Sequence, residues 1–310
     1  MRTAFSVFAL MGIISSAHAA VDLETALSNV RASCGGISEE LNTMKTLAGI
    51  GTGVSAAGAL AGGAAVATGV MKMGTDTEIA DWEQKLLDLM ADEIGEPIAE
   101  ISQQEYDDAM KILAAAGKDK EIKNTIAQLE QKSETLGNIR TGTLAATTAA
   151  NIAGAAVGGV NMKKARGSLS EQVSECLASV KELSAAYGQA RISRTASEED
   201  LGRVETIVRV CDEWSTVDLS KIDNRATGAF ASSVVGAATG AAGTVTSVLA
   251  NSNGVRNGDA AKEKNLNTAS NILAGGATVA SGAATIFNAT QISVIKRAST
   301  VADACEGALK

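Results

Sequence analysis

The sequence contains a single histidine, His18, among its 310 residues. This histidine lies in an N-terminal segment that we expect to be removed, which would leave no side chain whose unperturbed pKa is near neutrality. No nucleophile with its base, no metal-ligand spacing and no complete phosphate-binding glycine loop is present. We therefore predict a protein that is not an enzyme, with no catalytic residue, no metal site, no cofactor and no identified small-molecule substrate.

Proline and aromatic residues are also scarce. Pro97 is the only proline, and aromatic residues make up 3% of the chain. Together with abundant Ala, Leu, Glu, Lys and Gln, this composition favours helices over a turn-rich sheet and predicts an all-α fold of long up-and-down helices. The net charge of −8 argues against nucleic acid as a partner.

Charged side chains are missing from four long stretches. The stretches lie between Lys45 and Lys72, Arg140 and Lys163, Arg225 and Arg256, and Lys264 and Lys296. Each exceeds the roughly 20 residues that cross a bilayer, but consists mostly of Ala, Gly, Ser and Thr, which let helix backbones approach closely. In this glycine-zipper pattern we expect helix packing at Gly49, Gly53, Gly58, Gly62, Gly154, Gly158, Gly228, Gly236, Gly240, Gly243, Gly275 and Gly282.

The first 19 residues have the pattern of a secretory signal peptide. Arg2 precedes an apolar run from Ala4 to Ile14, and Ala17 with Ala19 forms an A-x-A cleavage pattern. The run is too short for a membrane anchor. We expect export to the periplasm, the outer envelope or the exterior.

The two halves of the sequence match in spacing, which predicts an internal duplication. The matching positions are Cys34 and Cys211, Gly49 and Gly228, Leu136 and Leu266, and Cys176 and Cys305. Each half would form one antiparallel helical hairpin. Shared Ala and Gly composition is the alternative explanation of the match.

The repeat also predicts the domain boundaries. They are 1–19 for the signal peptide, 20–74 for the outgoing arm of the first hairpin, 75–135 for an acidic helical insertion at its tip, 136–192 for the return arm and 193–310 for the second hairpin. Asn253-Gly254 and Asn257-Gly258 indicate the second tip. Ser102 with Glu105 has the form of a capping box inside the insertion. Its acidic surface is either a solvated face or a docking surface for a basic partner.

Four cysteines in an exported protein normally form two disulfides, and three pairings are possible. The repeat favours Cys34 with Cys176 and Cys211 with Cys305, each closing the base of one hairpin. A reactive or metal-binding thiol is the alternative, but no histidine and no C-x-x-C spacing accompanies these residues.

Two functions remain open from the sequence. The length, lack of charge and small residues of the four stretches favour hairpins that associate with a membrane or self-assemble, as in envelope assembly or pore formation. The partners would be further copies of the chain, other envelope proteins or a lipid bilayer. The alternative is a soluble periplasmic or secreted helical bundle that serves as scaffold, adhesin or binding protein. Few aromatic residues at the stretch boundaries and weak hydrophobicity oppose a conventional inner-membrane protein. Alanine-rich helix faces that pack closely, with two disulfides at the base, would suffice for the soluble bundle.

Overall fold

A computed structural model describes residues 22–94, 111, 117–256 and 260–310. The signal peptide, the capping box at Ser102 and the turn dipeptide Asn257-Gly258 lie outside these residues. The described residues are almost entirely helical and contain no strand, which confirms the predicted all-α fold of helical hairpins.

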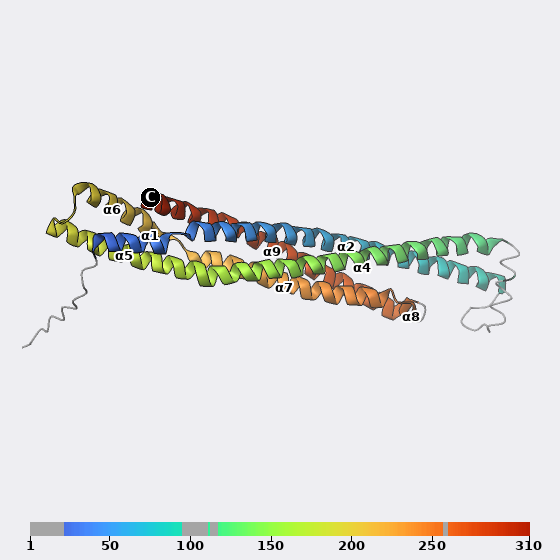
Figure 1. Ribbon diagram of the computed structural model, residues 1–310. Coiled ribbons are helices and arrows are strands. Elements are labelled where there is room, and N and C mark those ends of the chain that lie inside the picture. Colours follow the sequence, from blue (N-terminus) through green and yellow to red (C-terminus); the bar gives the residue numbers. More distant parts are fainter. Residues whose placement is uncertain (1–21, 95–110, 112–116, 257–259) are drawn as a thin grey trace, which may run out of the picture. The chain divides into compact units, whose positions relative to one another are not determined.

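The described helices follow one another along the chain (Figure 1). They are α1 (Leu23–Cys34), α2 (Ile37–Ile94), α4 (Lys118–Lys164), the π-helical turn η2 (Ala165–Leu169), α5 (Ser170–Ser193), α6 (Glu198–Cys211), the 3-10 helix η3 (Asp212–Thr216), α7 (Leu219–Ala250), α8 (Asn253–Arg256) and α9 (Ala260–Leu309).

Local sequence explains where several of these helices begin and end. Ser197 caps α6 by accepting the backbone N–H of Asp200 at 3.1 Å. Gly36 lies between α1 and α2 at a φ of 90°, which glycine adopts without strain. Before α7, Ser220 and Lys221 donate hydrogen bonds that lower the pKa of the Asp218 carboxyl group.

The helices form two compact units, and each unit contains parts of both hairpins. Unit 1 comprises the described residues up to Asn42 with residues 168–217 and 297–310, and unit 2 comprises residues 43–167 and 218–296. The compact units therefore cut across the hairpins rather than coinciding with them.

Unit 1 has an apolar core. α1 and α5 pack together, and α6 packs on α5. Trp214 of η3 is almost fully buried. The other buried residues are Ala26, Val30, Cys34, Ile37, Leu41, Leu169, Val173, Cys176, Val180, Leu183, Ala186, Ala190, Leu201, Val204, Ile207, Cys211, Ala298, Ala302, Cys305 and Leu309. Such a core is typical of a helical domain in water.

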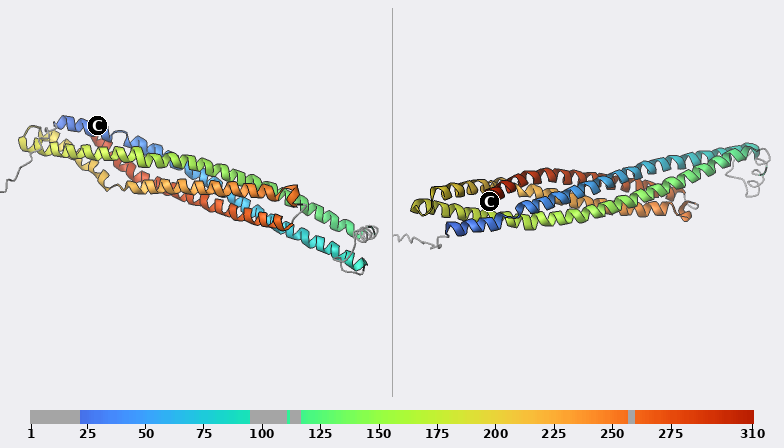
Figure 2. Two further views of the ribbon diagram at one scale, coloured as in Figure 1. Left: turned by 90° about the horizontal axis from the view of Figure 1, so that it is seen from below. Right: turned by 45° about the horizontal axis from the view of Figure 1, so that its top comes forward.

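In unit 2, α2, α4, α7 and α9 run side by side (Figures 1 and 2). Gly240 of α7 lies against Thr148 of α4, and Gly158 of α4 lies against Phe230 of α7, so these helices are antiparallel. α2 and α9 pair in the same way, with Gly62 against Thr278.

The two pairs of helices repeat the same contact. Thr148 and Thr278 are 130 residues apart, and their glycine partners Gly240 and Gly62 are 178 residues apart. The spacing of 130 recurs in the direct hydrogen bonds between α4 and α9. Residues of α4 thus lie opposite the residues of α9 that match them in the repeat. This arrangement is expected for two hairpins of duplicated sequence.

The tips of the hairpins differ. α8 forms one helical turn at Asn253-Gly254, where the sequence indicates the second tip. In the first hairpin, residues 75–94 continue α2 and residues 118–135 belong to α4. Ser133 donates a hydrogen bond to Asp76 at 2.5 Å across these two segments. The described parts of the predicted insertion are therefore extensions of the hairpin helices.

Candidate functional site

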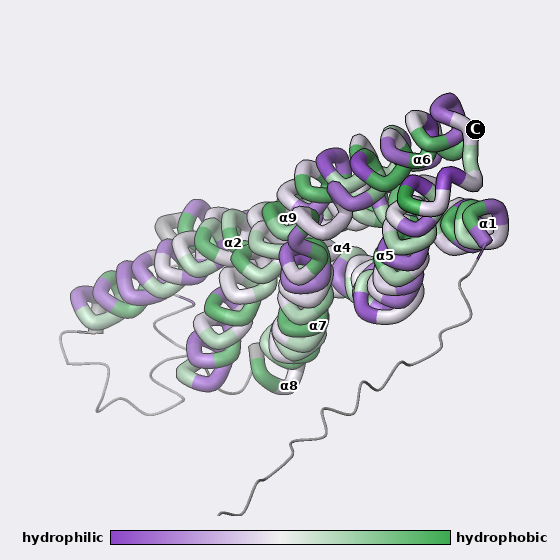
Figure 3. The backbone as a smooth tube through the Cα atoms, turned by 90° about the vertical axis from the view of Figure 1, so that its left-hand side faces the viewer, coloured by the Kyte–Doolittle hydropathy of each residue, from purple (hydrophilic) through white to green (hydrophobic). Residues whose placement is uncertain are grey.

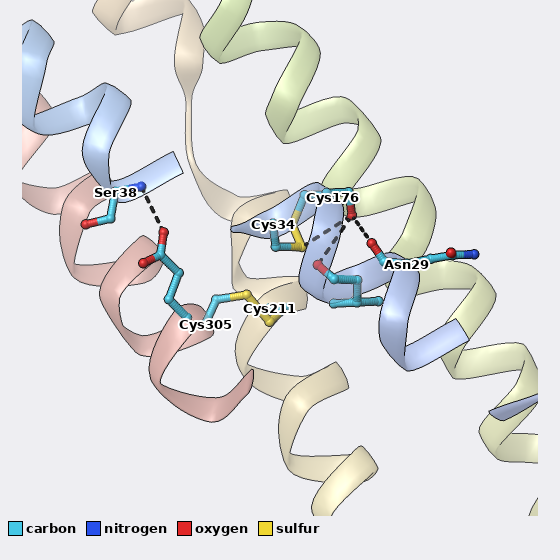
Figure 4. The surroundings of a disulfide bond; sticks show 9 residues. Asn29, Cys34, Ser38, Cys176, Cys211 and Cys305 are labelled. Carbon is cyan, nitrogen blue, oxygen red and sulfur yellow. Dashed lines mark hydrogen bonds between the residues drawn. A yellow bond between two sulfur atoms is a disulfide. The ribbon is translucent and has the colours of Figure 1, made fainter. Parts of the chain in front are cut away.

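The four cysteines form two disulfides inside unit 1 (Figure 4). Cys34 of α1 is bonded to Cys176 of α5, and Cys211 of α6 to Cys305 of α9, as the repeat predicts. Sulfur atoms of the two bonds lie side by side, with those of Cys34, Cys176 and Cys305 within 4.8 Å of one another. All four sulfurs are bonded and buried, so they are neither exposed nucleophiles nor thiolate ligands.

Most of the glycines expected to pack helices lie against a neighbouring helix of unit 2. A Cβ added at any of them would come within 3.3 Å of a neighbouring atom. They are Gly58, Gly62, Gly154, Gly158, Gly228, Gly236, Gly240 and Gly243. Four others do not, contrary to expectation: at Gly49, Gly53, Gly275 and Gly282 an added Cβ would meet nothing within 4 Å. These four face away from the helix contacts.

Three further glycines make close contacts that zipper spacing did not single out. Gly51, Gly69 and Gly137 lie against Asn288, Asn271 and Asn251 respectively. In each case the neighbour is an asparagine side chain, so the glycine makes room for a polar group. The asparagines within the apolar stretches were the sequence feature that could have indicated these three contacts.

The interior of unit 2 is lined with polar side chains. Every buried polar or charged residue found in the described chain belongs to this unit. They are Ser55, Thr68, Lys72, Thr75, Ser133, Arg140, Thr147, Asn151, Asn161, Ser233, Ser247, Asn267, Ser270, Ser281, Asn288 and Gln291. Alanines and some larger apolar residues are buried in unit 2 as well, so its interior is mixed, whereas the interior of unit 1 is apolar.

Hydrogen bonds connect α4 to α9 through this interior. Asn151 Nδ2 donates to Ser281 Oγ at 2.9 Å, and Ser281 Oγ donates to Asn151 Oδ1 at 3.0 Å. Asn161 Nδ2 donates to Gln291 Oε1 at 2.9 Å. Other buried polar atoms have no partner among the described residues, including the hydroxyls of Ser55 and Ser233. The buried polar groups of unit 2 are therefore only partly hydrogen-bonded among the described residues.

Along its charge-free stretches, the exterior of unit 2 is mostly apolar. Leu60 is 78% exposed and Val279 is 73% exposed. From Ala226 to Ala250 of α7, every exposed residue is Ala, Val or Leu. Apart from Ile192, all exposed large apolar residues of the described chain lie in unit 2: Ile50, Leu60, Val70, Met71, Ile139, Ile152, Val160, Val234, Val235, Val245, Val248, Leu249, Ile272, Val279 and Ile286. Figure 3 shows green and pale residues along much of α7 and purple residues recurring along α6.

Threonine hydroxyls in the apolar stretches are used within their own helices. Thr239 donates to the carbonyl oxygen of Val235 at 2.9 Å, and Thr246 donates to that of Ala242 at 3.0 Å. Thr278 donates to Ala274 in the same way. Such bonds reduce the cost of placing threonine in a medium without water.

Among the described residues, buried charged side chains lie at the ends of the charge-free stretches. Lys72 is 1% exposed and donates to Asp76 and Glu263, each at 2.8 Å. Arg140 is fully buried and donates to Asn267 Oδ1 at 3.0 Å and to its carbonyl oxygen at 2.8 Å. These charges therefore have partners, as buried charges require.

Within the described residues, four helical regions are long and apolar enough to cross a membrane, by length and composition alone. Each contains all or most of one charge-free stretch of unit 2. Comparison with protein-family models, with curated proteins and with solved structures finds no match for the chain.

Proposed function

We propose that the chain is an exported, non-enzymatic protein whose unit 2 associates with a lipid bilayer through the outer faces of its charge-free stretches. The observation that carries the proposal is the polarity of these stretches, which bury Ser, Thr, Asn and Gln beside alanine and expose large apolar side chains. Helical bundles in water place such apolar side chains inside, whereas bundles in lipid can place polar residues in their interior.

The size of the exposed apolar surface supports lipid as the surrounding medium. Removing one Val, Leu or Ile side chain from water contributes roughly 1.5–3 kcal/mol when burial is complete. The exposed residues of unit 2 are between about half and three quarters exposed. Their transfer into lipid would contribute on the order of 10 kcal/mol. Backbone groups within the helices already have their hydrogen bonds, so they do not oppose the transfer.

The disulfides support export. Both bonds lie in a core that is otherwise apolar, and disulfides persist in oxidising compartments outside the cytosol. Unit 1, with its apolar core and polar exterior, is suited to water in such an oxidising compartment. This proposal agrees with the signal-peptide pattern in the sequence.

Flotation with phospholipid vesicles tests the proposal. Purified protein should float with the vesicles and resist extraction by alkaline carbonate. Replacing Val235 and Val279 by lysine should reduce the floating fraction severalfold, because a lysine costs about 2.5–3.5 kcal/mol in the centre of a bilayer. The control Ile192→Lys changes an exposed apolar residue of unit 1 and should float like the unaltered protein. Recovery of all three proteins in the aqueous fraction would favour the soluble scaffold instead.

Self-assembly through the same exterior is a second candidate function. At Gly49 and Gly53 on α2, and at Gly275 and Gly282 on α9, an added Cβ would meet no atom of another helix within 4 Å. Glycines on an outer helix face admit the helix of another copy at short distance. Cross-linking in vesicles should then give discrete oligomers that Gly53→Leu with Gly282→Leu abolishes. Release of a trapped dye would identify the assembly as a pore.

A further inference from the structure

Seven basic residues gather at one end of the charge-free stretches of unit 2. They come from α2, α4, η2, α7 and α9, so every helix with a charge-free stretch contributes. All seven belong to unit 2. We call this set the basic belt: Lys45, Lys163, Lys164, Arg166, Lys221, Arg225 and Lys296.

Contacts between helices place the α2, α4 and α9 members of the basic belt at the same end of unit 2. Asn161 Nδ2 of α4 donates to Gln291 Oε1 of α9 at 2.9 Å. Gly51 of α2 lies against the side chain of Asn288 of α9. These contacts lie within two turns of the lysines on the same helices. The end of the α4 stretch therefore lies beside the start of the α2 stretch and the end of the α9 stretch.

The α7 members lie at this end as well. Arg166 Nε donates to Asp223 Oδ1 at 2.7 Å, which joins η2 to the beginning of α7. The guanidinium carbon of Arg225 lies 5.9 Å from the centre of the Phe287 ring, which joins α7 to α9. The basic belt therefore extends over all four helix directions of unit 2.

Basic residues outnumber carboxylates in the basic belt. Its segments are residues 43–50, 160–167, 218–227 and 290–296. They contain the seven basic residues and only two acidic ones, Asp218 and Asp223, which pair with Lys221 and Arg166. Residues 75–94, at the other end of α2, contain seven acidic residues and one basic residue. The basic belt thus has a charge opposite in sign to that of the far end of α2.

Helix stabilisation does not explain the positive charge at the start of α7. Cations are unfavourable near a helix N-terminus, where carboxylates are preferred. Lys221 nevertheless lies in the first turn of α7, and no acidic residue lies in that turn. The side chains of Lys221 and Arg166 are 65% and 55% exposed, and Lys163 is also exposed. These cations can therefore meet an anion outside the chain.

The basic belt borders the apolar exterior of unit 2. Ile50 of α2 is 49% exposed and Val160 of α4 is 50% exposed, each within two turns of a lysine of the belt. A bilayer has the same order of layers, because phosphate headgroups lie directly outside its hydrocarbon. Clusters of Lys and Arg at this position attract anionic lipids.

We propose that the basic belt binds the headgroups of anionic phospholipids at the surface of the bilayer that unit 2 enters. This inference rests on the proposed association with lipid and adds the class of lipid. Seven cations on five elements suit a surface that presents many phosphates, rather than a single free phosphate ion. Long basic side chains also reach from the edge of the hydrocarbon to the headgroups.

Lipid titrations of the full-length protein, followed by flotation, test the inference. Vesicles of phosphatidylcholine alone are compared with vesicles of equal parts phosphatidylcholine and phosphatidylglycerol. We expect the anionic vesicles to bind at least about tenfold more tightly, and about 0.5 M salt to remove this gain by screening.

A double variant tests the assignment to the basic belt. Lys163→Gln with Lys221→Gln should weaken binding to the anionic vesicles at least about tenfold, since each lysine near an anionic surface contributes about fivefold. Binding to phosphatidylcholine should not change. The control Lys132→Gln with Lys181→Gln removes two exposed lysines outside the basic belt and should bind both kinds of vesicle like the unaltered protein.

The outcomes separate this inference from the proposed function. Equal binding to the two kinds of vesicle, or equal losses from the two double variants, would overturn the inference, while flotation with phosphatidylcholine alone would still support association with lipid. Flotation with neither kind would contradict the proposed function itself. If inorganic phosphate abolishes the gain at an ionic strength where chloride does not, the basic belt takes free phosphate and the inference is wrong.

Discussion

Gly158 of α4 lies directly against the backbone of α7. A Cβ at this position would come within 3.1 Å of the Cα and 3.2 Å of the nitrogen of Phe230. Because backbone atoms cannot move aside without shifting a helix, we expect Gly158→Ala to lower the free energy of unfolding by about 1–3 kcal/mol. Urea unfolding followed by circular dichroism in mild detergent measures this change.

Gly53→Ala is the matched control for Gly158→Ala. Gly53 is also helical, but an added Cβ would meet nothing within 4 Å. Alanine is the better helix former, so this change should stabilise the protein by about 0.5–1 kcal/mol. Equal effects of the two substitutions would show that Gly158 does not lie at a close helix contact.

Two buried serines provide a second comparison at the residue scale. Ser281→Ala would leave Asn151 Oδ1 without its donor, and should destabilise the protein by about 1–3 kcal/mol. Ser233→Ala removes a buried hydroxyl that has no partner in the described structure, and should be nearly neutral. The same unfolding measurement separates them. A larger loss from Ser233→Ala than from Ser281→Ala would contradict the assigned hydrogen bonds.

The sequence could predict that glycines pack helices, but not which face of each helix does so. Ala and Gly occupy all sides of the charge-free helices. The sequence therefore has no polar face from which the inward-facing side of each helix could be predicted. Gly53 and Gly58 therefore look alike in sequence, although only Gly58 contacts a neighbouring helix. Gly69, beside Asn271, shows that asparagines mark some contacts better than glycine spacing does.

At the scale of helices, the matching cysteine spacing in the two halves of the sequence predicts the disulfide pairing that the structure has. Each bond joins the start of one hairpin to its end, at sequence separations of 142 and 94 residues. Equal arm lengths in the two halves were sufficient to predict this pairing. The extension of α2 to Ile94 was not predicted, because amphipathic residues after Met73 fit a separate helix equally well.

Removal of the second disulfide should destabilise unit 1. Cys211→Ala with Cys305→Ala should lower its free energy of unfolding by about 2–5 kcal/mol, because a long loop of the unfolded chain is released. Trp214 is buried in unit 1 and its fluorescence reports the transition. In a Trp82→Phe background, an unchanged urea midpoint would contradict a structural role for the bond.

At the scale of the whole molecule, the two units differ in the medium that their surfaces suit. Unit 1 buries apolar residues, whereas the charge-free stretches of unit 2 bury Ser, Thr, Asn and Gln beside alanine and expose Val, Ile and Leu. The sequence showed which stretches lack charge but could not show this inversion. Helices rich in Ala and Gly carry few polar residues and few large apolar residues. Only the packing of these helices shows which of the two kinds faces outward.

Collisional accessibility of spin labels in phospholipid vesicles tests this inversion most directly. Labels would be placed at Leu60 and Val279 of unit 2 and at Ile192 of unit 1, all exposed apolar positions. We predict that the labels at Leu60 and Val279 collide with oxygen and are shielded from a water-soluble nickel reagent, while the label at Ile192 collides with the nickel reagent. If all three labels are equally accessible to the nickel reagent, unit 2 does not face lipid and the account is contradicted.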